Sequence, residues 1–163
     1  MSTEQIAKTL AALFGELVDG TAGRPGGYML NGGDPGLLAS LDRLSAEAAS
    51  KAATGGASVA AHVGHLRFSL SLGNRWAAGE ENPYADADWP GSWRTGTVTE
   101  AEWERLRAGL RDEAHRWLEA LRAPREVGEM ELGGMIGSIG HLAYHVGAIR
   151  QIDRAARGPS AEE

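Results

Sequence analysis

Apolar residues recur at three- and four-residue steps along most of this chain, the period that gathers side chains on one face of an α-helix. Residues 3–18 carry the first such face. Ser2, just before this range, and Gln5, within it, have the spacing of a capping box. A glycine-rich stretch, residues 21–33, is predicted to be a loop. Three large apolar residues of this loop are expected to pack against the core. They are Tyr28, Met29 and Leu30.

Two weaker helical signals precede the next long helix. Asp34-Pro35 is a capping residue followed by a first-turn proline, so a short, leucine-rich helix is predicted to begin there. The Ala- and Ser-rich stretch 45–53 either extends this helix or frays, and Gly55-Gly56 closes it. Ser58 then caps a long helix over residues 59–78, whose apolar stripe includes a histidine.

The second half of the chain predicts two more long helices. Residues 79–97 contain two Pro-based breakers and form a long ordered loop, whose aromatic residues we expect to pack over one end of the molecule. A second capping box opens a helix over residues 99–123. The last helix begins between Glu129 and Gly134 and ends near Arg157.

No strand pattern competes with these helical periods. The predicted fold is therefore all-α, a four-helix bundle with one additional short helix. The 163 residues suit a single domain, which we place at residues 1–158, with a short C-terminal tail at residues 159–163. No apolar run approaches the roughly 18 residues of a membrane-spanning helix. The polar N-terminus lacks the organisation of a signal peptide, so we expect a cytoplasmic protein that does not engage a membrane.

Composition narrows the chemistry that is open to the chain. It has no cysteine, which excludes disulfides, thiolate metal sites and cysteine nucleophiles. Any metal must then be held by nitrogen and oxygen ligands. The formal net charge is −6, and no cluster of Lys and Arg could follow a phosphate backbone, which argues against nucleic acid as a partner.

Four of the five histidines fall in two helical clusters. His141 and His145 are four residues apart, so their rings leave the last helix on the same side, one turn apart, and can bind one zinc- or nickel-like ion. His62 lies on the apolar stripe of the helix over residues 59–78 and is the favoured third ligand. His65, on the flank of that stripe, is a second candidate. Because unsatisfied imidazoles are costly to bury and few carboxylates share these stripes, a metal site is favoured over four separate core histidines.

Other polar and aromatic residues have weaker claims to a function. His115 sits among Arg, Asp and Glu on a charged helix face, and we expect it to be exposed. Trp89 and Trp93 either roof a pocket or pack against a second subunit. Three carboxylates of the long loop either approach a substrate or form a solvated rim. They are Glu80, Glu81 and Asp86.

Two segments resemble motifs of the DinB/YfiT-like superfamily. Residues 58–66, SVAAHVGHL, are similar to its second-helix motif, in which a histidine precedes an aliphatic and a small residue. Residues 140–149, GHLAYHVGAI, are similar to its fourth-helix motif, His-x-x-x-His followed by a basic residue, Gly and Gln. The likeness covers most of the chain. It implies a four-helix bundle, commonly dimeric, with one divalent metal held by three histidines near one end.

Carried over position by position, the resemblance implies His62, His141 and His145 as the metal ligands. His65 stands where relatives often have Asp or another polar residue, so it either supports a ligand or replaces one. The chain departs from the pattern just after the last ligand, where hydrophobic side chains replace the usual basic residue and Gln. These positions are Val146 and Ala148.

The resemblance also implies an activity. Three imidazoles leave positions on the metal open to water or substrate, which is the layout of a catalytic site. Because characterised relatives include thiol-dependent S-transferases and a thiol-dependent isomerase, we expect a metal-dependent enzyme that uses a low-molecular-weight thiol and an electrophilic substrate. A homodimer is expected. The alternative is a non-catalytic dimer of the same class with a stress-related binding or structural role.

Overall fold

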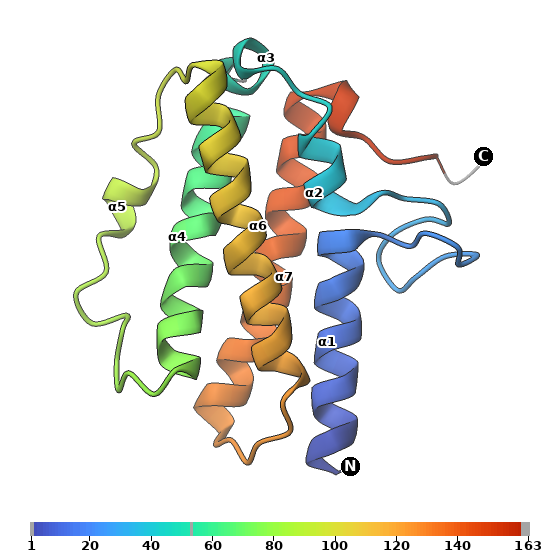
Figure 1. Ribbon diagram of the computed structural model, residues 1–163, viewed down its shortest axis with the longest axis vertical. Helices are drawn as coiled ribbons and strands as arrows, with labels where there is room; N and C mark the ends of the chain where they lie inside the picture. Colours follow the sequence, from blue (N-terminus) through green and yellow to red (C-terminus); the bar gives the residue numbers. More distant parts are fainter. Residues whose placement is uncertain (1, 53, 161–163) are drawn as a thin grey trace.

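Four long helices form the body of the molecule in the computed structural model, which describes residues 2–52 and 54–160 (Figure 1). They are α1 (Thr3–Asp19), α4 (Val59–Ala77), α6 (Glu100–Arg122) and α7 (Glu129–Ile152). Shorter elements connect them: α2 (Gly36–Leu41), α3 (Ala46–Ser50), α5 (Trp89–Ser92) and the 3₁₀ turn η1 (Arg154–Ala156). The described residues contain no strand, so the predicted all-α bundle is confirmed.

Local hydrogen bonds fix where the long helices begin. Ser2 with Gln5 and Thr99 with Glu102 form both capping boxes that the sequence predicts. The side chain of Ser58 accepts a hydrogen bond from the third residue of its helix, at the start of α4. Each of these caps satisfies a backbone N–H that the helix itself leaves unpaired, so the three starting points are set by short-range chemistry.

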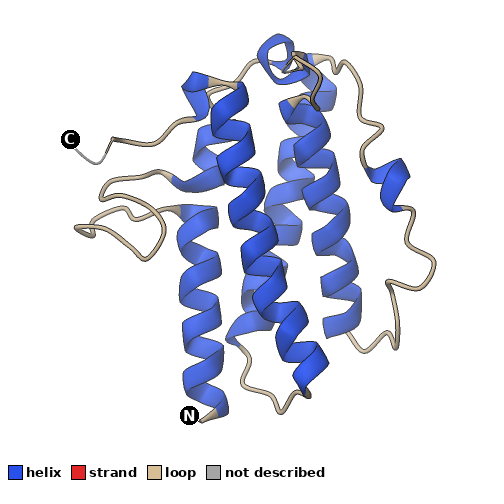
Figure 2. Ribbon diagram, turned by 180° about the vertical axis from the view of Figure 1, so that it is seen from behind, coloured by secondary structure: helices blue, strands red, loops and turns tan. Residues whose placement is uncertain are grey.

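The direction of the helices requires one long connection. In Figures 1 and 2, α1 and α7 run one way along the bundle, whereas α4 and α6 run the other way. Because α4 is roughly 28 Å long, the chain must travel that distance back before it can begin a helix parallel to it. The segment between α4 and α6, residues 78–99, makes this return along the side of α4 and carries α5. The expectation that the aromatic residues of this segment pack over one end of the bundle was therefore wrong for Trp89 and Trp93, which contact His65 along α4.

Large apolar side chains from all four long helices form one continuous core. The most deeply buried include Phe14, Leu66, Trp103, Leu142 and Ile149. The Trp103 indole N–H donates to the carbonyl oxygen of Leu44 at 2.8 Å and so ties the start of α6 to the turn before α3. Because the polar end of this side chain is satisfied, the ring is buried at little electrostatic cost.

The structure differs from the sequence prediction in three places, two separate short helices and one helix end, and each difference has a local cause. The stretch 45–53 forms the separate helix α3, since the Ser45 hydroxyl caps a new start; residue 53 lies outside the described residues. Within the long loop, Asp88 accepts from the backbone N–H of Gly91 and begins α5. The last helix ends at Ile152 rather than near Arg157, because Asp153 is extended and caps η1.

A buried carboxylate organises the loop after α1. Glu16 is 2% exposed, and its two oxygens accept from the backbone N–H groups of Tyr28, Met29 and Leu30 at 2.7–2.8 Å. A Cβ atom at Gly27 would overlap this carboxylate, so the close approach requires glycine. The loop backbone supplies these three bonds, and the Thr21 hydroxyl adds a further one to the carbonyl oxygen of Asn31. Of the three residues expected in the core, Leu30 is buried, while Tyr28 is 84% and Met29 40% exposed.

The C-terminal end of α7 is joined to the start of α2. Arg150 donates to the buried carboxylate of Asp34 at 2.7 Å, and the same carboxylate accepts from the backbone N–H of Gly36. Beyond η1 the chain returns to the first loop, where the Asn31 amide donates to the carbonyl oxygen of Pro159 at 2.9 Å. The predicted tail at 159–163 is described only to residue 160, and residues 161–163 lie outside the description.

Replacing Glu16 by Gln should lower the free energy of unfolding by about 1–3 kcal/mol, because one amide oxygen cannot accept from three buried N–H groups. Equilibrium unfolding in urea measures the change. Glu104→Gln, on an exposed position of α6, is the matched control and should stay within about 0.5 kcal/mol of the parent. If Glu16→Gln and the parent unfold at the same urea concentration, the carboxylate does not hold the loop.

Candidate metal centre

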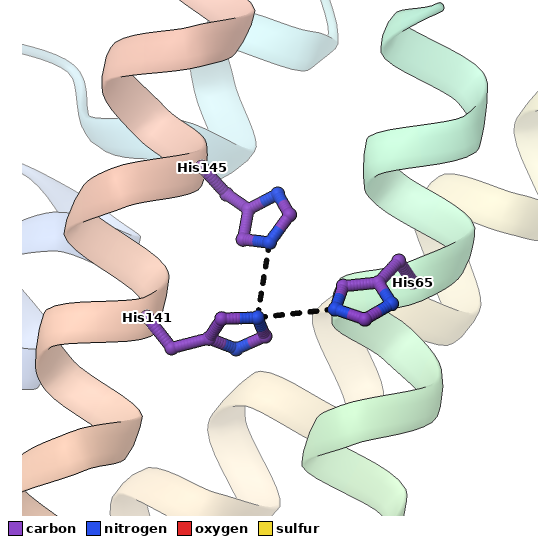
Figure 3. A group of neighbouring side chains, drawn as sticks. All are labelled: His65, His141 and His145. Carbon is purple, nitrogen blue, oxygen red and sulfur yellow. Dashed lines mark hydrogen bonds between the residues drawn. The ribbon is translucent and has the colours of Figure 1, made fainter. Parts of the chain in front are cut away.

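Two pairs of histidines meet between α4 and α7. His62 and His65 lie on adjacent turns of α4, and His141 and His145 lie one turn apart on α7. His62, His65 and His145 are buried, with exposed fractions of 6%, 6% and 1%, and His141 is partly exposed. Figure 3 shows the rings of His65, His141 and His145 pointing toward one another from the two helices.

The Nε2 atoms of three of these rings converge. The Nε2 atom of His141 lies 3.1 Å from Nε2 of His65 and 3.0 Å from Nε2 of His145. The three residues form a group whose ligand atoms all lie within 4.8 Å of one another. Three nitrogens bound to one tetrahedral ion at about 2.0–2.1 Å would be roughly 3.3 Å apart. The spacing therefore suits three ligands of one metal ion.

Protons alone do not account for these contacts. A neutral imidazole nitrogen carries either one hydrogen or one lone pair, so it satisfies one close neighbour at a time. The Nε2 atom of His141 has two such neighbours, at nearly equal distances. One shared cation would instead accept a lone pair from each of the three nitrogens, so the donor set fits a divalent metal.

The Nδ1 atoms, which face away from the three Nε2 atoms, have hydrogen-bond partners that leave each Nε2 free to bind a metal. The Ser92 hydroxyl donates to the carbonyl oxygen of Trp89, so it accepts from Nδ1–H of His65 at 2.7 Å. Nδ1 of His141 faces the Ser69 hydroxyl at 3.4 Å, and Nδ1 of His145 faces Nδ1 of His62 at 2.8 Å. A proton on each Nδ1 leaves the lone pair on Nε2, which is how hydrogen bonds behind a metal ligand orient it.

His62 occupies a different place from the one that the sequence pattern favours. Its Nδ1 contacts the side of the His145 ring that faces away from the three Nε2 atoms, and it does not belong to the converging group. The placement favours His65 as the third ligand and gives His62 a supporting contact. His62 and His65 are equally buried, at 6% exposed, so the difference between them is which ring nitrogen each one faces and not how deep it lies.

Aromatic side chains from the long connection cover the histidines. The Trp93 ring stacks on His65 with centroids 4.2 Å apart and lies 5.6 Å from His145. Trp89 lies 5.8 Å from the His65 ring. Both tryptophans therefore cover the site, and the other expected role, packing against a second subunit, stays a prediction. A Cβ atom at Gly64 would overlap the Thr95 hydroxyl, so this glycine lets the connection lie close against α4.

Burial keeps the four rings neutral. Desolvation lowers the pKa of His62 and of His141, and it lowers the pKa of His65 to about 4 and that of His145 to about 3, with further lowering from the neighbouring histidines. The hydrogen-bond partners found for these rings among the described residues are serine hydroxyls and one another. Neutral imidazole is the form that binds a metal.

A cavity of about 250 Å³ ends against His141. Its other walls are mainly apolar and aromatic, and they include Leu70, Trp89 and Trp117. The indole N–H of Trp117 donates to the Ser138 hydroxyl at 2.9 Å, which fixes that ring at the cavity wall. A small molecule can therefore lie next to the candidate metal centre without contacting the charged outer surface.

Two residues at this site were not predicted to have a functional role. Ser92 and Ser69 belong to no motif, and their role follows only from which helices and loops become neighbours. The aromatic content of the loop did signal Trp89 and Trp93. His115, which was expected to be exposed, is exposed and contacts Asp19 at 2.9 Å, away from the other four histidines.

Lowering the pH should destabilise the metal-free protein before its carboxylates titrate. The pKa values of His65 and His145 are lower in the folded state than the unfolded value of about 6.5. Below pH 6.5 the unfolded state therefore binds more protons than the folded state, and protonation shifts the equilibrium toward unfolding. Between pH 7 and 5 each of the two histidines should lower the free energy of unfolding by roughly 1–2 kcal/mol. Urea unfolding of chelator-treated protein at several pH values measures this loss. An unfolding free energy that stays constant from pH 7 to 5 would contradict it.

Comparison with known proteins identifies the family. A family model described as the DinB superfamily matches residues 35–149, which include α4, α6 and both histidine clusters. Searches of curated proteins and of solved structures give no match. None of the described helices is long and apolar enough to cross a membrane. The match covers most of the chain and agrees with its helical bundle and histidine group, and we conclude that this protein belongs to the DinB superfamily.

Proposed function

We propose that this protein is a divalent-metal-dependent enzyme whose metal is held by His65, His141 and His145. The observation that carries the proposal is the convergence of three Nε2 atoms, each on a ring whose Nδ1 has a partner. His62 supports His145 through the contact between their Nδ1 atoms. Zinc and nickel are the metals that suit three imidazole ligands with a position left open.

The chemistry of such a centre follows from its ligands. A metal bound by three neutral imidazoles keeps its positive charge and lowers the pKa of a thiol or water that reaches its open position. Ser92 and Ser69 hold their histidines in orientation, and Trp93 covers the rings on the side of the long connection. The cavity beside His141 then provides the place for a substrate.

We further propose that the reaction is transfer to the sulfur of a low-molecular-weight thiol. The sulfur would attack an electrophilic carbon, a C–S bond would form, and the leaving group would depart with its bonding electrons, while the thiol proton passes to solvent. Hydrolysis would need a general base, and the partners found for the histidines among the described residues include no carboxylate. We place the protein in the cytoplasm, where small thiols stay reduced, and infer a homodimer from its family.

The first test concerns the metal and its ligands. Protein purified without a polyhistidine tag should contain one divalent ion per chain, and His65→Gln, His141→Gln and His145→Gln should each lose it. His62→Gln should retain the ion but bind it about 10–100-fold more weakly, because His62 acts through His145. Elemental analysis and competition with a chromophoric chelator measure both quantities.

His115→Gln is the matched control, since its ring lies on the outer surface, and it should bind metal like the parent. If His62→Gln loses the metal while His65→Gln retains it, the third ligand is His62 and the assignment above is wrong. If no variant and no parent protein binds a divalent ion, the proposed function fails.

The second test concerns activity. The metal-loaded protein should accelerate conjugation of a small thiol to at least one member of a panel of alkyl halides, epoxides and activated alkenes. Chelation should abolish this acceleration. His65→Gln should lower kcat/KM by about 100-fold or more, because the variant loses the metal that activates the thiol. Loss of free thiol, followed with a colorimetric reagent, measures the rate. A metal-loaded protein that is silent toward the alkyl halides and epoxides, the members that undergo displacement at carbon, would favour the non-catalytic dimer.

A further inference from the structure

A second cavity adjoins the one beside His141. It has a volume of about 450 Å³ and lies between the C-terminal part of α4, the start of the long connection and the first turns of α7. Tyr84, Trp117 and Gly134 line both cavities, so the two meet at these residues. We call the cavity beside His141 the inner cavity and the second one the outer cavity. His141 lines only the inner cavity, and the first turns of α7 line the outer one.

Acidic and aromatic side chains meet in the outer cavity. Its lining includes the carboxylates of Glu81 and Glu131 and the rings of Trp76, Trp117 and Tyr84. The Trp76 and Trp117 rings are 6.2 Å apart and inclined at 61°. Neither cavity is lined by Lys or Arg among the described residues. The guanidinium of Arg125 lies 5.5 Å from the Trp76 ring centroid without lining either cavity.

This combination selects for positive charge. The face of an indole or phenol ring attracts a cation, most strongly where water is partly excluded, and ammonium groups are recognised in this way. Two carboxylates at the same cavity add a Coulomb attraction, and they repel a carboxylate or phosphate group. A ligand with an anionic end would find no Lys or Arg for that end in the described lining.

The inner cavity offers space for an apolar part of the same ligand. Gly134 and Gly137 face it from α7, and a Cβ atom built at either position meets no atom within 4 Å. Glycine costs an α-helix roughly 1 kcal/mol relative to alanine, yet α7 keeps both residues where any side chain would narrow the cavity. The opposite wall is formed in part by Leu66 and Leu70 of α4.

We propose that the substrate of this site is an organic cation whose ammonium group binds among Trp76, Trp117, Tyr84, Glu81 and Glu131. Its apolar part lies over Gly134 and Gly137, and its reactive end reaches His141. The assignment of the reactive end rests on the proposed function, whereas the cation site stands on the outer cavity alone. A substrate of this kind differs from anionic small thiols, which the carboxylates would repel.

Three probes of similar length test the charge preference: phenylpropyl-trimethylammonium, phenylpentanamide and phenylpentanoate. Titration followed by tryptophan fluorescence, with isothermal calorimetry as a second readout, gives their dissociation constants for the full chain. The ammonium probe should bind about tenfold or more tightly than the amide, and the carboxylate more weakly still. Equal affinities, tighter binding of the carboxylate, or no binding of any probe would overturn the proposal.

Paired variants locate the site. Glu81→Gln combined with Glu131→Gln should remove most of the preference for the ammonium probe, while Glu129→Gln, also in the first turn of α7 but outside the cavity lining, should keep it. Gly137→Leu should weaken binding of the ammonium probe about fivefold or more by filling the inner cavity. Gly147→Leu, on the same helix and outside both linings, should not. If both members of either pair behave alike, the ligand does not lie where we place it.

The two proposals fail separately. The carboxylate probe can bind a metal and the ammonium probe cannot, so the three affinities are compared after metal is removed by chelation, and the ammonium probe is also measured with metal bound. If the protein binds one metal ion per chain but binds the three probes equally, the proposed metal centre stands and the proposed cation site is wrong. If the protein binds no metal but binds the ammonium probe most tightly, the proposed cation site stands and the proposed metal-dependent reaction is wrong.

Discussion

The parallel direction of α4 and α6 is the constraint on which the rest of the site depends. Two neighbouring helices that point the same way cannot be joined by a tight turn, so the chain must return along the length of the bundle. That return segment supplies Ser92, Trp89 and Trp93 beside His65, and Glu81 and Tyr84 at the outer cavity. A bundle with short loops throughout would hold the same four histidines without Ser92 and the two tryptophans beside His65.

The histidines themselves reflect a balance between burial and chemistry. Each buried ring loses solvation, and the loss is greatest for His145, which is 1% exposed. Hydrogen bonds from the rings to one another and to two serines recover only part of this cost, because two of the contacts compete for one nitrogen of His141. A divalent ion removes this competition, so metal binding would stabilise the fold as well as provide a reactive centre.

Much of the fold was predictable from the sequence because its signals are local. The capping boxes at Ser2 and Thr99 and the periodic apolar faces each depend on residues within one or two turns. The site was predictable only in part. The spacing of His141 and His145 identified their shared face, but the choice between His62 and His65 depends on how α4 is rotated against α7. Ser92 was out of reach, since its contact with His65 joins residues 27 positions apart through an irregular segment.

The attachment of Ser92 has a consequence for how this protein can change during evolution. The orientation of His65 is set from a segment outside the helical core, and that segment is organised by its own short-range contacts, Asp88 with Gly91 and Ser92 with Trp89. Substitutions there could alter the metal's environment or the covering of the pocket without disturbing the packing of the four long helices. The histidines on α4 and α7 can thus stay in place while the segment that orients and covers them varies.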